Sequence, residues 1–462
     1  MSAAGLVPPE RSTALATAPQ FPPGPRGMTG FRELLTFVAA PTTGFEMLRD
    51  RYGDACAIRA LGDTLVFLAD PAVITEVLQD KDAVFHKDMV TASLAEFLGQ
   101  GLLTSEDALW RRQRKLISPS LTKKQVGKYG ATMVQRTVEF VRAVKASGTR
   151  DVHADMARLT LDVVVDTLFG TQLEGDMTTA IATEMDAISQ AFQSLVQTWR
   201  RFFPKWFPFA ARRRVRRASR TLSAIVAGLV AKKRAEGATG DDLLTRLVAA
   251  RDDDVSAMSD DQLRDETVTF ILAGHETTAN ALAFGLYLLA QHPEVVAELR
   301  RERDAVLGSD REATLEDLPK LTYADAVFRE VMRVYPPAYM IGRQPTRDVV
   351  VGPYAIPAGC QILMSAWALH HDPRQFQDPL AFRPERWLDG LAERLPKHAY
   401  MPFGGGTRVC IGNHFAMMEG ALMISTLAGH LDFATTPETS LDLMAAITLR
   451  PRDALPLRVS PR

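Results

Sequence analysis

The longest uninterrupted helical pattern in the chain covers residues 259–292, SDDQLRDETVTFILAGHETTANALAFGLYLLAQH. Ser259 and Gln262 form a capping-box pattern at its start, and Pro293 cannot continue the hydrogen-bond ladder beyond its end. About 32 residues at ~1.5 Å each give a helix of roughly 48 Å, which crosses an entire domain. Because residues 270–290 are apolar on nearly all sides, the sequence predicts a buried central helix.

The remaining pattern is mostly helical, with few strands. A buried helix is predicted before Gly170, and a second helix is predicted from Thr178 past Trp199. An aromatic and basic loop follows at residues 202–217. Short runs broken by Gly and Pro predict strands, and they occur at residues 55–70, 348–366, 441–451 and 454–460. The predicted fold class is therefore mainly α with small β-sheets (α+β) at the two sequence ends.

Composition narrows the class of protein. Hydrophobic residues make up 46% of the 462 positions, enough for a large core, and the net charge of −1 argues against a nucleic-acid partner. The three widely spaced cysteines favour a reducing, cytoplasmic setting over a disulfide framework. We find no secretory signal, transmembrane anchor or linker between domains. The chain is therefore expected to be soluble, with a flexible Pro-rich lead-in at residues 1–27 and one catalytic domain at 28–462.

A glycine-rich stretch, FGGGTRVCIG, surrounds the cysteine at position 410 and spans residues 403–412. Glycines permit unusual backbone torsions and close approach of another group. A helical pattern follows, so peptide N–H groups at its start are expected to favour the Cys410 thiolate. Three interpretations remain open: a buried structural cysteine, a phosphate-binding loop without the usual Lys-Ser or Lys-Thr, and a thiolate ligand to haem.

The stretch resembles the haem-ligand loop of the cytochrome P-450 family, FxxGxxxCxG, at Phe403, Gly406, Cys410 and Gly412. Other family motifs follow in the expected order over nearly the whole chain. The resemblance implies the cytochrome P-450 fold, with haem b sandwiched between the long central helix and the helix after Cys410. It makes Cys410 the iron ligand and assigns Phe403 and Gly404 to haem binding.

Further motifs acquire roles through the same resemblance. In AGHETT, residues 273–278, it places Ala273 and Gly274 over the haem and makes Glu276 and Thr277 an acid–alcohol pair that delivers protons. Thr277 is expected to bond back to a carbonyl one turn earlier. The haem propionates are expected to meet four side chains, which are Arg408, Trp110, Arg114 and Arg343. A buried cluster expected to support folding comprises Glu330, Arg333 and Arg386.

The implied function is a monooxygenase that inserts one oxygen atom from O2 into a hydrophobic small molecule. Candidate substrates are fatty acids, terpenoids, steroids and macrolides, and the motif style leans toward fatty-acid hydroxylases. Pocket walls are expected at residues 93–103, 338–341 and 446–448.

Only 52 residues (462 − 410) follow Cys410, too few for a flavin reductase. Electrons from NAD(P)H are therefore expected through a separate ferredoxin or flavodoxin and its reductase, and the protein is expected to be a monomer. The alternatives are a peroxide-driven peroxygenase and a non-catalytic haem sensor.

Overall fold

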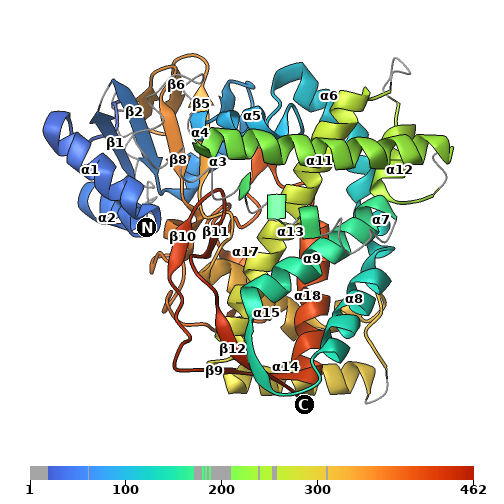
Figure 1. Cartoon of the computed structure of the whole chain (residues 1–462). Helices are drawn as coiled ribbons and strands as arrows, with labels where there is room; N and C mark the ends of the chain where they lie inside the picture. The colour runs from blue at the N-terminus through green and yellow to red at the C-terminus, as the bar shows by residue number, and fades with distance from the viewer. Residues whose placement is uncertain are drawn as a thin grey trace, which may run out of the picture.

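The computed structural model describes residues 19–60, 62–170, 179–181, 183–184, 187–188, 210–237, 240–251, 257–308 and 311–462. The α-helices in these ranges are α1 (Gly27–Ala39), α2 (Pro41–Tyr52), α3 (Pro71–Gln79), α4 (Met89–Ser93), α5 (Ala95–Leu98), α6 (Asp107–Ile117), α7 (Lys123–Gly127), α8 (Gly130–Ala143), α9 (Val152–Phe169), α11 (Ala210–Ala235), α12 (Leu243–Ala249), α13 (Asp260–Leu289), α14 (Pro293–Leu307), α15 (Thr322–Val334), α16 (Ala366–His370), α17 (Leu391–Arg394) and α18 (Asn413–His430). Helices form most of the molecule, and the strands lie mainly to one side (Figure 1). The mainly α fold class is confirmed.

Helix α13 is the predicted central helix. Ser259 and Gln262 form the capping box, with their reciprocal bonds at 3.1 and 3.2 Å. The helix ends at Leu289, and Pro293 starts α14 as its first residue. Helices α9, α11, α15 and α18 all pack against α13, which runs through the middle of the molecule (Figure 1). The prediction of a buried central helix is therefore confirmed.

The helices before α13 agree in part with the sequence pattern. Helix α9 ends as predicted at Gly170, which takes the left-handed conformation with φ of 60°. Most of the helix expected over 178–199, and the aromatic part of 202–217, lie outside the described residues. The basic part of 202–217 belongs to α11, where exposed Arg216 approaches Glu96 at 3.6 Å. No helix in the described ranges has an apolar stretch long enough to cross a membrane.

The largest sheet joins segments that are far apart in the sequence. Its strands are β1 (Ala55–Ala60), β2 (Asp63–Leu68), β8 (Gln361–Met364), β5 (Ile341–Pro345) and β3 (Phe85–Lys87), in this spatial order. Strands β2 and β8 pair in parallel, and the other pairs are antiparallel. The expectation of small sheets confined to the two sequence ends is therefore wrong for this sheet. Local patterns do not encode such long-range pairing, and β3 is too short to show alternation.

The other strands of the described residues form smaller, separate sheets. One sheet has the order β4 (Gly148–Asp151), β12 (Pro456–Pro461) and β9 (Leu431–Thr435), and two hairpins are β6 (Val349–Val351) with β7 (Tyr354–Ile356) and β10 (Leu443–Ala445) with β11 (Leu449–Pro451). The proline-rich residues 19–26 run beside β1 and the β6–β7 hairpin. The Gln20 N–H donates to the Pro353 carbonyl at 3.0 Å, and the Ala57 N–H donates to the Pro23 carbonyl at 2.7 Å.

The predicted charged cluster on α15 is buried. Arg333 donates through Nε and Nη2 to the two carboxylate oxygens of Glu330, at 2.9 and 2.8 Å, and both side chains are fully buried. Arg386 Nε donates to Glu330 Oε1 at 3.0 Å, and Trp387 Nε1 donates to Oε2 at 2.9 Å. Because buried charges require such partners, the cluster holds α15 against the loop after α16.

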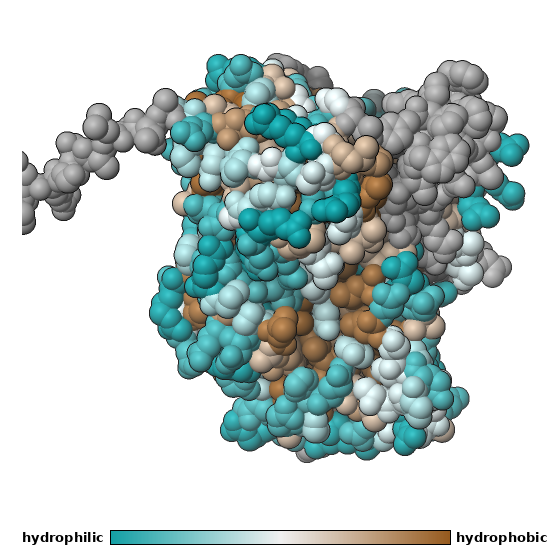
Figure 2. Space-filling model, turned by 90° about the vertical axis from the view of Figure 1, so that its left-hand side faces the viewer, coloured by the Kyte–Doolittle hydropathy of each residue, from teal (hydrophilic) through white to brown (hydrophobic). Residues whose placement is uncertain are grey.

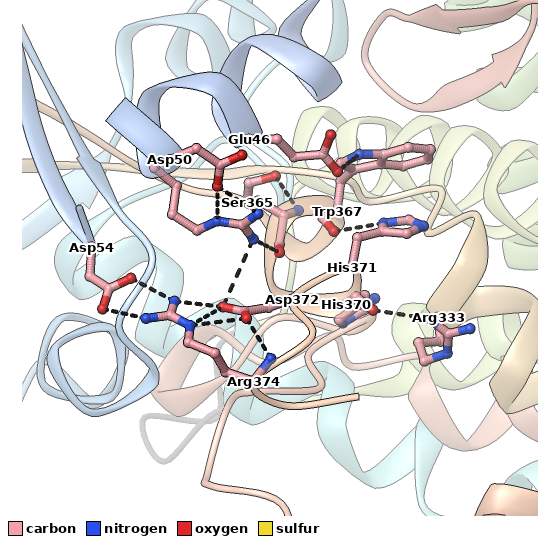
Figure 3. A network of polar contacts seen from close by, with 12 residues as sticks. Glu46, Asp50, Asp54, Arg333, Ser365, Trp367, His370, His371, Asp372 and Arg374 are labelled. Atoms are coloured by element: carbon pink, nitrogen blue, oxygen red, sulfur yellow. Dashed lines mark hydrogen bonds and ion pairs between the residues drawn. The ribbon is translucent and has the colours of Figure 1, made fainter. Parts of the chain in front are cut away.

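Figure 3 shows how this cluster continues toward the N-terminal part of the molecule. Arg333 Nη1 donates to the His370 carbonyl at 3.0 Å, at the end of α16. Two residues further along, Asp372 accepts three bonds from the Arg374 guanidinium, which also donates to Asp54 at 2.7 and 2.9 Å. The network therefore links α15 and α16 to the chain just before β1.

Candidate active site

The glycines before Cys410 are required mainly by close backbone packing. Gly404 and Gly406 have φ of 69° and 65°, a region that other residues rarely adopt. A Cβ at Gly406 would lie 1.6 Å from the carbonyl oxygen of Leu78, at the end of α3. By contrast, a Cβ at Gly412 would have only Cys410 Sγ within 4 Å, at 3.9 Å. Gly412, unlike Gly406, therefore leaves open space beside the cysteine sulfur.

Cys410 combines exposure with surroundings that resist ionisation. Its side chain is exposed, whereas Cys56 and Cys360 are buried. Desolvation by the surrounding protein raises the pKa of the Cys410 thiol, and this outweighs the opposing effects of the Gly412 N–H and the Arg114 charge. The expected thiolate preference is therefore wrong for the chain by itself, because desolvation exceeds the helix-start contribution. A bound metal ion would favour the thiolate form of this sulfur.

The AGHETT segment forms an accessible strip on α13, just before the part of the helix that is almost entirely buried. Ala273 is exposed, and Glu276 and Thr277 are half-buried. Thr277 Oγ1 donates to the Ala273 carbonyl at 2.7 Å, which confirms the predicted back-bond. A Cβ at Gly274 would meet Val164 Cγ2 at 3.2 Å, so this glycine permits close packing of α13 against α9.

Arg408 and Trp110, two of the residues expected at the propionates, contact each other. The Arg408 guanidinium carbon sits 3.9 Å from the centre of the Trp110 ring. Arg408 also donates to the Ser105 carbonyl at 3.0 Å and forms an ion pair with Glu106. Arg114 has a different position, because its Nη1 donates to the Val409 carbonyl at 2.9 Å, directly beside the cysteine.

Two further buried cations lie near Arg408. Arg343 donates to the Gly342 carbonyl at 2.8 Å, and burial followed by the Arg408 charge lowers its pKa. Lys87, which sequence reasoning missed, donates to the carbonyls of Leu102 and Ser105 at 3.2 and 2.8 Å. Burial, followed by the charge of Arg408, lowers the pKa of Lys87 to about 7. Arg408, Arg343 and Lys87 are thus cations bonded to backbone carbonyls. Such a group suits a ligand with more than one carboxylate, such as a haem with two propionates.

A cavity opens between α1, α4, β2 and the turn between β10 and β11. Its wall includes members of all three predicted segments, which are Leu94, Tyr339, Met340, Ala446 and Ile447. The polar wall residues are Asp63, Asp88, Thr91 and Gln361, and no lysine or arginine occurs among the described residues that line it. Figure 2 views the molecule from the α1 side, where hydrophobic side chains gather in the middle of a largely hydrophilic face.

These features fit a haem with a cysteine ligand: an exposed thiol beside clearance at Gly412, an accessible strip on α13, and buried cations. The sequence profile described as cytochrome P-450 matches residues 22–454. The chain belongs to the cytochrome P-450 family. It is 33% identical over 438 residues to cyclooctat-9-en-7-ol 5-monooxygenase of Streptomyces melanosporofaciens, covering 94% of this chain and 93% of the relative.

Two more relatives agree with this assignment. Cyclooctatin synthase of Streptomyces melanosporofaciens is 32% identical, covering 89% of this chain and 88% of the relative. Pentalenene oxygenase of Streptomyces avermitilis is 30% identical, covering 89% of this chain and 91% of the relative. The cytochrome P-450 is thus a haem-b-dependent monooxygenase for hydrophobic small molecules. It uses O2 and, as is general in the family, electrons from NAD(P)H through redox partners.

Proposed function

We propose that Cys410 supplies the thiolate that binds the haem iron, and that this site hydroxylates an uncharged, terpenoid-like substrate. The accessible Cys410 thiol, with clearance at Gly412, is the observation that carries the ligand assignment. The haem, when bound, supplies the oxygen-activating chemistry. Phe403 and Gly404 complete the loop: the Cys410 N–H donates to the Phe403 carbonyl at 3.0 Å and fixes the direction of the cysteine.

On helix α13, Ala273 and Gly274 would face the bound haem, and Glu276 and Thr277 would move protons. The Thr277 hydroxyl is held by its bond to the Ala273 carbonyl. It lies one residue after a half-buried carboxylate, so the two groups can pass a proton through water. This arrangement favours O2-dependent turnover over a peroxygenase or a non-catalytic sensor.

The propionates would be held by Arg408, Trp110, Arg343 and Lys87, with Arg114 acting nearer the cysteine loop. Arg408 and Arg343 are buried or nearly so, and charge-assisted hydrogen bonds to carboxylates would offset the cost of burying them. Loss of such a donor should weaken haem retention more than loss of an exposed cation.

Electron delivery is proposed to come from a ferredoxin or flavodoxin with its reductase. Such carriers are acidic, and exposed Arg111 and Lys115 on α6 offer complementary charge close to Arg114 and the cysteine loop. We further propose that the protein is a cytoplasmic monomer with one catalytic domain. This domain begins before the expected residue 28, because Gln20 donates to the Pro353 carbonyl and the Pro23 carbonyl accepts from Ala57.

The substrate assignment depends on the cavity wall. A free fatty acid would need a cation or several donors for its carboxylate, yet the wall carries Asp63 and Asp88. The relatives described above act, by their names, on cyclooctat-9-en-7-ol and pentalenene, an alkenol and an alkene. An uncharged cyclic terpenoid therefore fits better than the fatty acids that the sequence motifs favoured.

The test is turnover with purified redox partners. A ferredoxin, its reductase and NADPH should give a hydroxylated terpenoid in the presence of O2, and removal of O2 should abolish the product. Product formation with hydrogen peroxide alone, and none with the redox partners, would overturn the monooxygenase assignment. A fatty acid bound more tightly than its own methyl ester would overturn the substrate assignment.

A further inference from the structure

Three polar side chains that the proposed function does not use connect Glu276 to the start of α9. The Thr448 hydroxyl, in the turn just before β11, donates to Glu276 Oε1 at 2.7 Å. Asn280 Nδ2, one turn further along α13, donates to Thr448 Oγ1 at 3.1 Å. His153 Nε2, at the first turn of α9, lies 2.9 Å from Asn280 Oδ1. Thr448 contacts the carboxylate directly, and Asn280 and His153 extend the row of hydrogen bonds to α9.

The middle of this row of hydrogen-bonded side chains lies in the protein interior. Asn280 is fully buried and Thr448 is 7% exposed. Their neighbours Ala279, Ala281 and Leu449 are buried apolar residues. Asn is a poor helix former, and burying its amide is costly unless both ends are hydrogen-bonded. An apolar side chain would serve packing at this position, so the polar chain requires a reason beyond packing.

The hydrogen bonds can run in one direction only. Asn280 Oδ1 can only accept, so His153 Nε2 must carry the proton in this bond. Asn280 Nδ2 then faces Thr448 and donates to its oxygen. A threonine hydroxyl has a single proton, which is therefore left for the Glu276 carboxylate. If the amide were turned round, Thr448 would donate to Asn280, and the bond from Thr448 to Glu276 would be lost.

We propose that Thr448, Asn280 and His153 are positioning residues that hold the Glu276 carboxylate in the orientation needed to relay protons. This inference rests on the proposed role of Glu276. The Thr448 donor restrains rotation of this carboxylate about its side-chain bonds. Thr448 directly follows Ala446 and Ile447, which line the cavity. The turn that contacts an entering substrate therefore also holds the proton-relay carboxylate.

The functional test measures hydrogen peroxide released per electron consumed, in the haem-loaded enzyme with its redox partners. Thr448→Val should raise this ratio on the order of tenfold, the scale expected from one lost hydrogen bond to a charged group. Thr448→Ser, which restores the hydroxyl, should stay close to wild type. Thr137→Val is the matched control, because Thr137 is also buried and its hydroxyl donates to the Met133 carbonyl of its own helix.

A double-mutant cycle then separates this proposal from the proposed function. Glu276→Gln should itself raise peroxide release, and Thr448→Val should add nothing in that background. If Glu276→Gln raises peroxide release but Thr448→Val behaves like the Thr137 control, the positioning role is wrong and the role of Glu276 stands. If Glu276→Gln has no effect while the haem-thiolate band is intact, both roles fall.

A second readout does not depend on activity. Nitrogen NMR of selectively labelled histidine, in the diamagnetic reduced carbon-monoxide form, reports which ring nitrogen carries the proton. The His153 signal, identified by its loss in His153→Gln, should show protonation at Nε2. A proton found only at Nδ1 would overturn the directional chain, because Nε2 would then accept from a reversed Asn280 amide.

Discussion

Replacing Arg333 by methionine is predicted to destabilise the protein severely. Arg333 is fully buried and makes five hydrogen bonds, two to Glu330 and one each to the carbonyls of His370, Pro379 and Ala381. Removing one member of a buried ion pair typically costs about 3–5 kcal/mol, because the remaining charge stays buried.

The structure places this variant toward the lower part of that range. Glu330 would keep three donors, which are Arg386 Nε, Trp387 Nε1 and the Arg383 N–H, so its charge is not left isolated. The three carbonyls that lose a donor add to the cost. We therefore expect a loss of about 3–4 kcal/mol in the free energy of unfolding.

The assay is urea unfolding followed by far-UV circular dichroism, with haem content measured in parallel. Arg301→Met is the control, because Arg301 forms an exposed ion pair with Glu298 on α14, and such pairs contribute about 0–1 kcal/mol. Glu330→Leu combined with Arg333→Met should be less destabilising than the sum of the single changes. An Arg333→Met variant within about 1 kcal/mol of wild type would refute the reasoning.

Three further predictions concern the buried charges and the cavity. Burial raises the pKa of Glu419 from 4.5 to about 8. Between these pH values the native protein holds a proton that the unfolded chain releases, so the free energy of unfolding should fall as pH rises from about 4.5 to 8. Glu419→Gln should lack this decline when melting is followed between these pH values; a parallel decline in both proteins would contradict the assignment. Lys87→Met should release haem to apomyoglobin several-fold faster than wild type, whereas exposed Lys81→Met should match wild type. Asp63→Arg should tighten binding of a fatty acid, followed by the haem optical shift, without changing binding of its methyl ester; equal changes for both ligands would argue against a charge effect.

The local elements could be predicted because their signals are short-range. Ser259 with Gln262 fixed the start of α13, and Gly170 ended α9, because caps depend on residues within one turn. The spacing of Phe403 and Cys410 likewise marks the cysteine loop, because the motif lies within ten consecutive residues. The hydrogen bond from the Thr277 hydroxyl to the Ala273 carbonyl could also be predicted, because it joins residues one turn apart in the same helix.

Other features depend on contacts across the fold. Strand β3 pairs with β5, and Lys87 meets Ser105 only because these segments converge. The need for glycine at position 406 comes from Leu78 on α3 and has no counterpart in the local sequence. The direction of the Cys410 pKa shift also escaped prediction, because desolvation depends on how much of the protein surrounds the sulfur.

The central claim is that the sulfur of Cys410 binds the haem iron, and the carbon-monoxide difference spectrum of the reduced protein tests it most directly. Wild type should give the haem-thiolate band, Cys410→Ala should lose it, and alanine at either buried cysteine, Cys56 or Cys360, should leave it unchanged. A wild-type spectrum without that band in haem-loaded protein, or a Cys410→Ala variant that keeps it, would contradict the account.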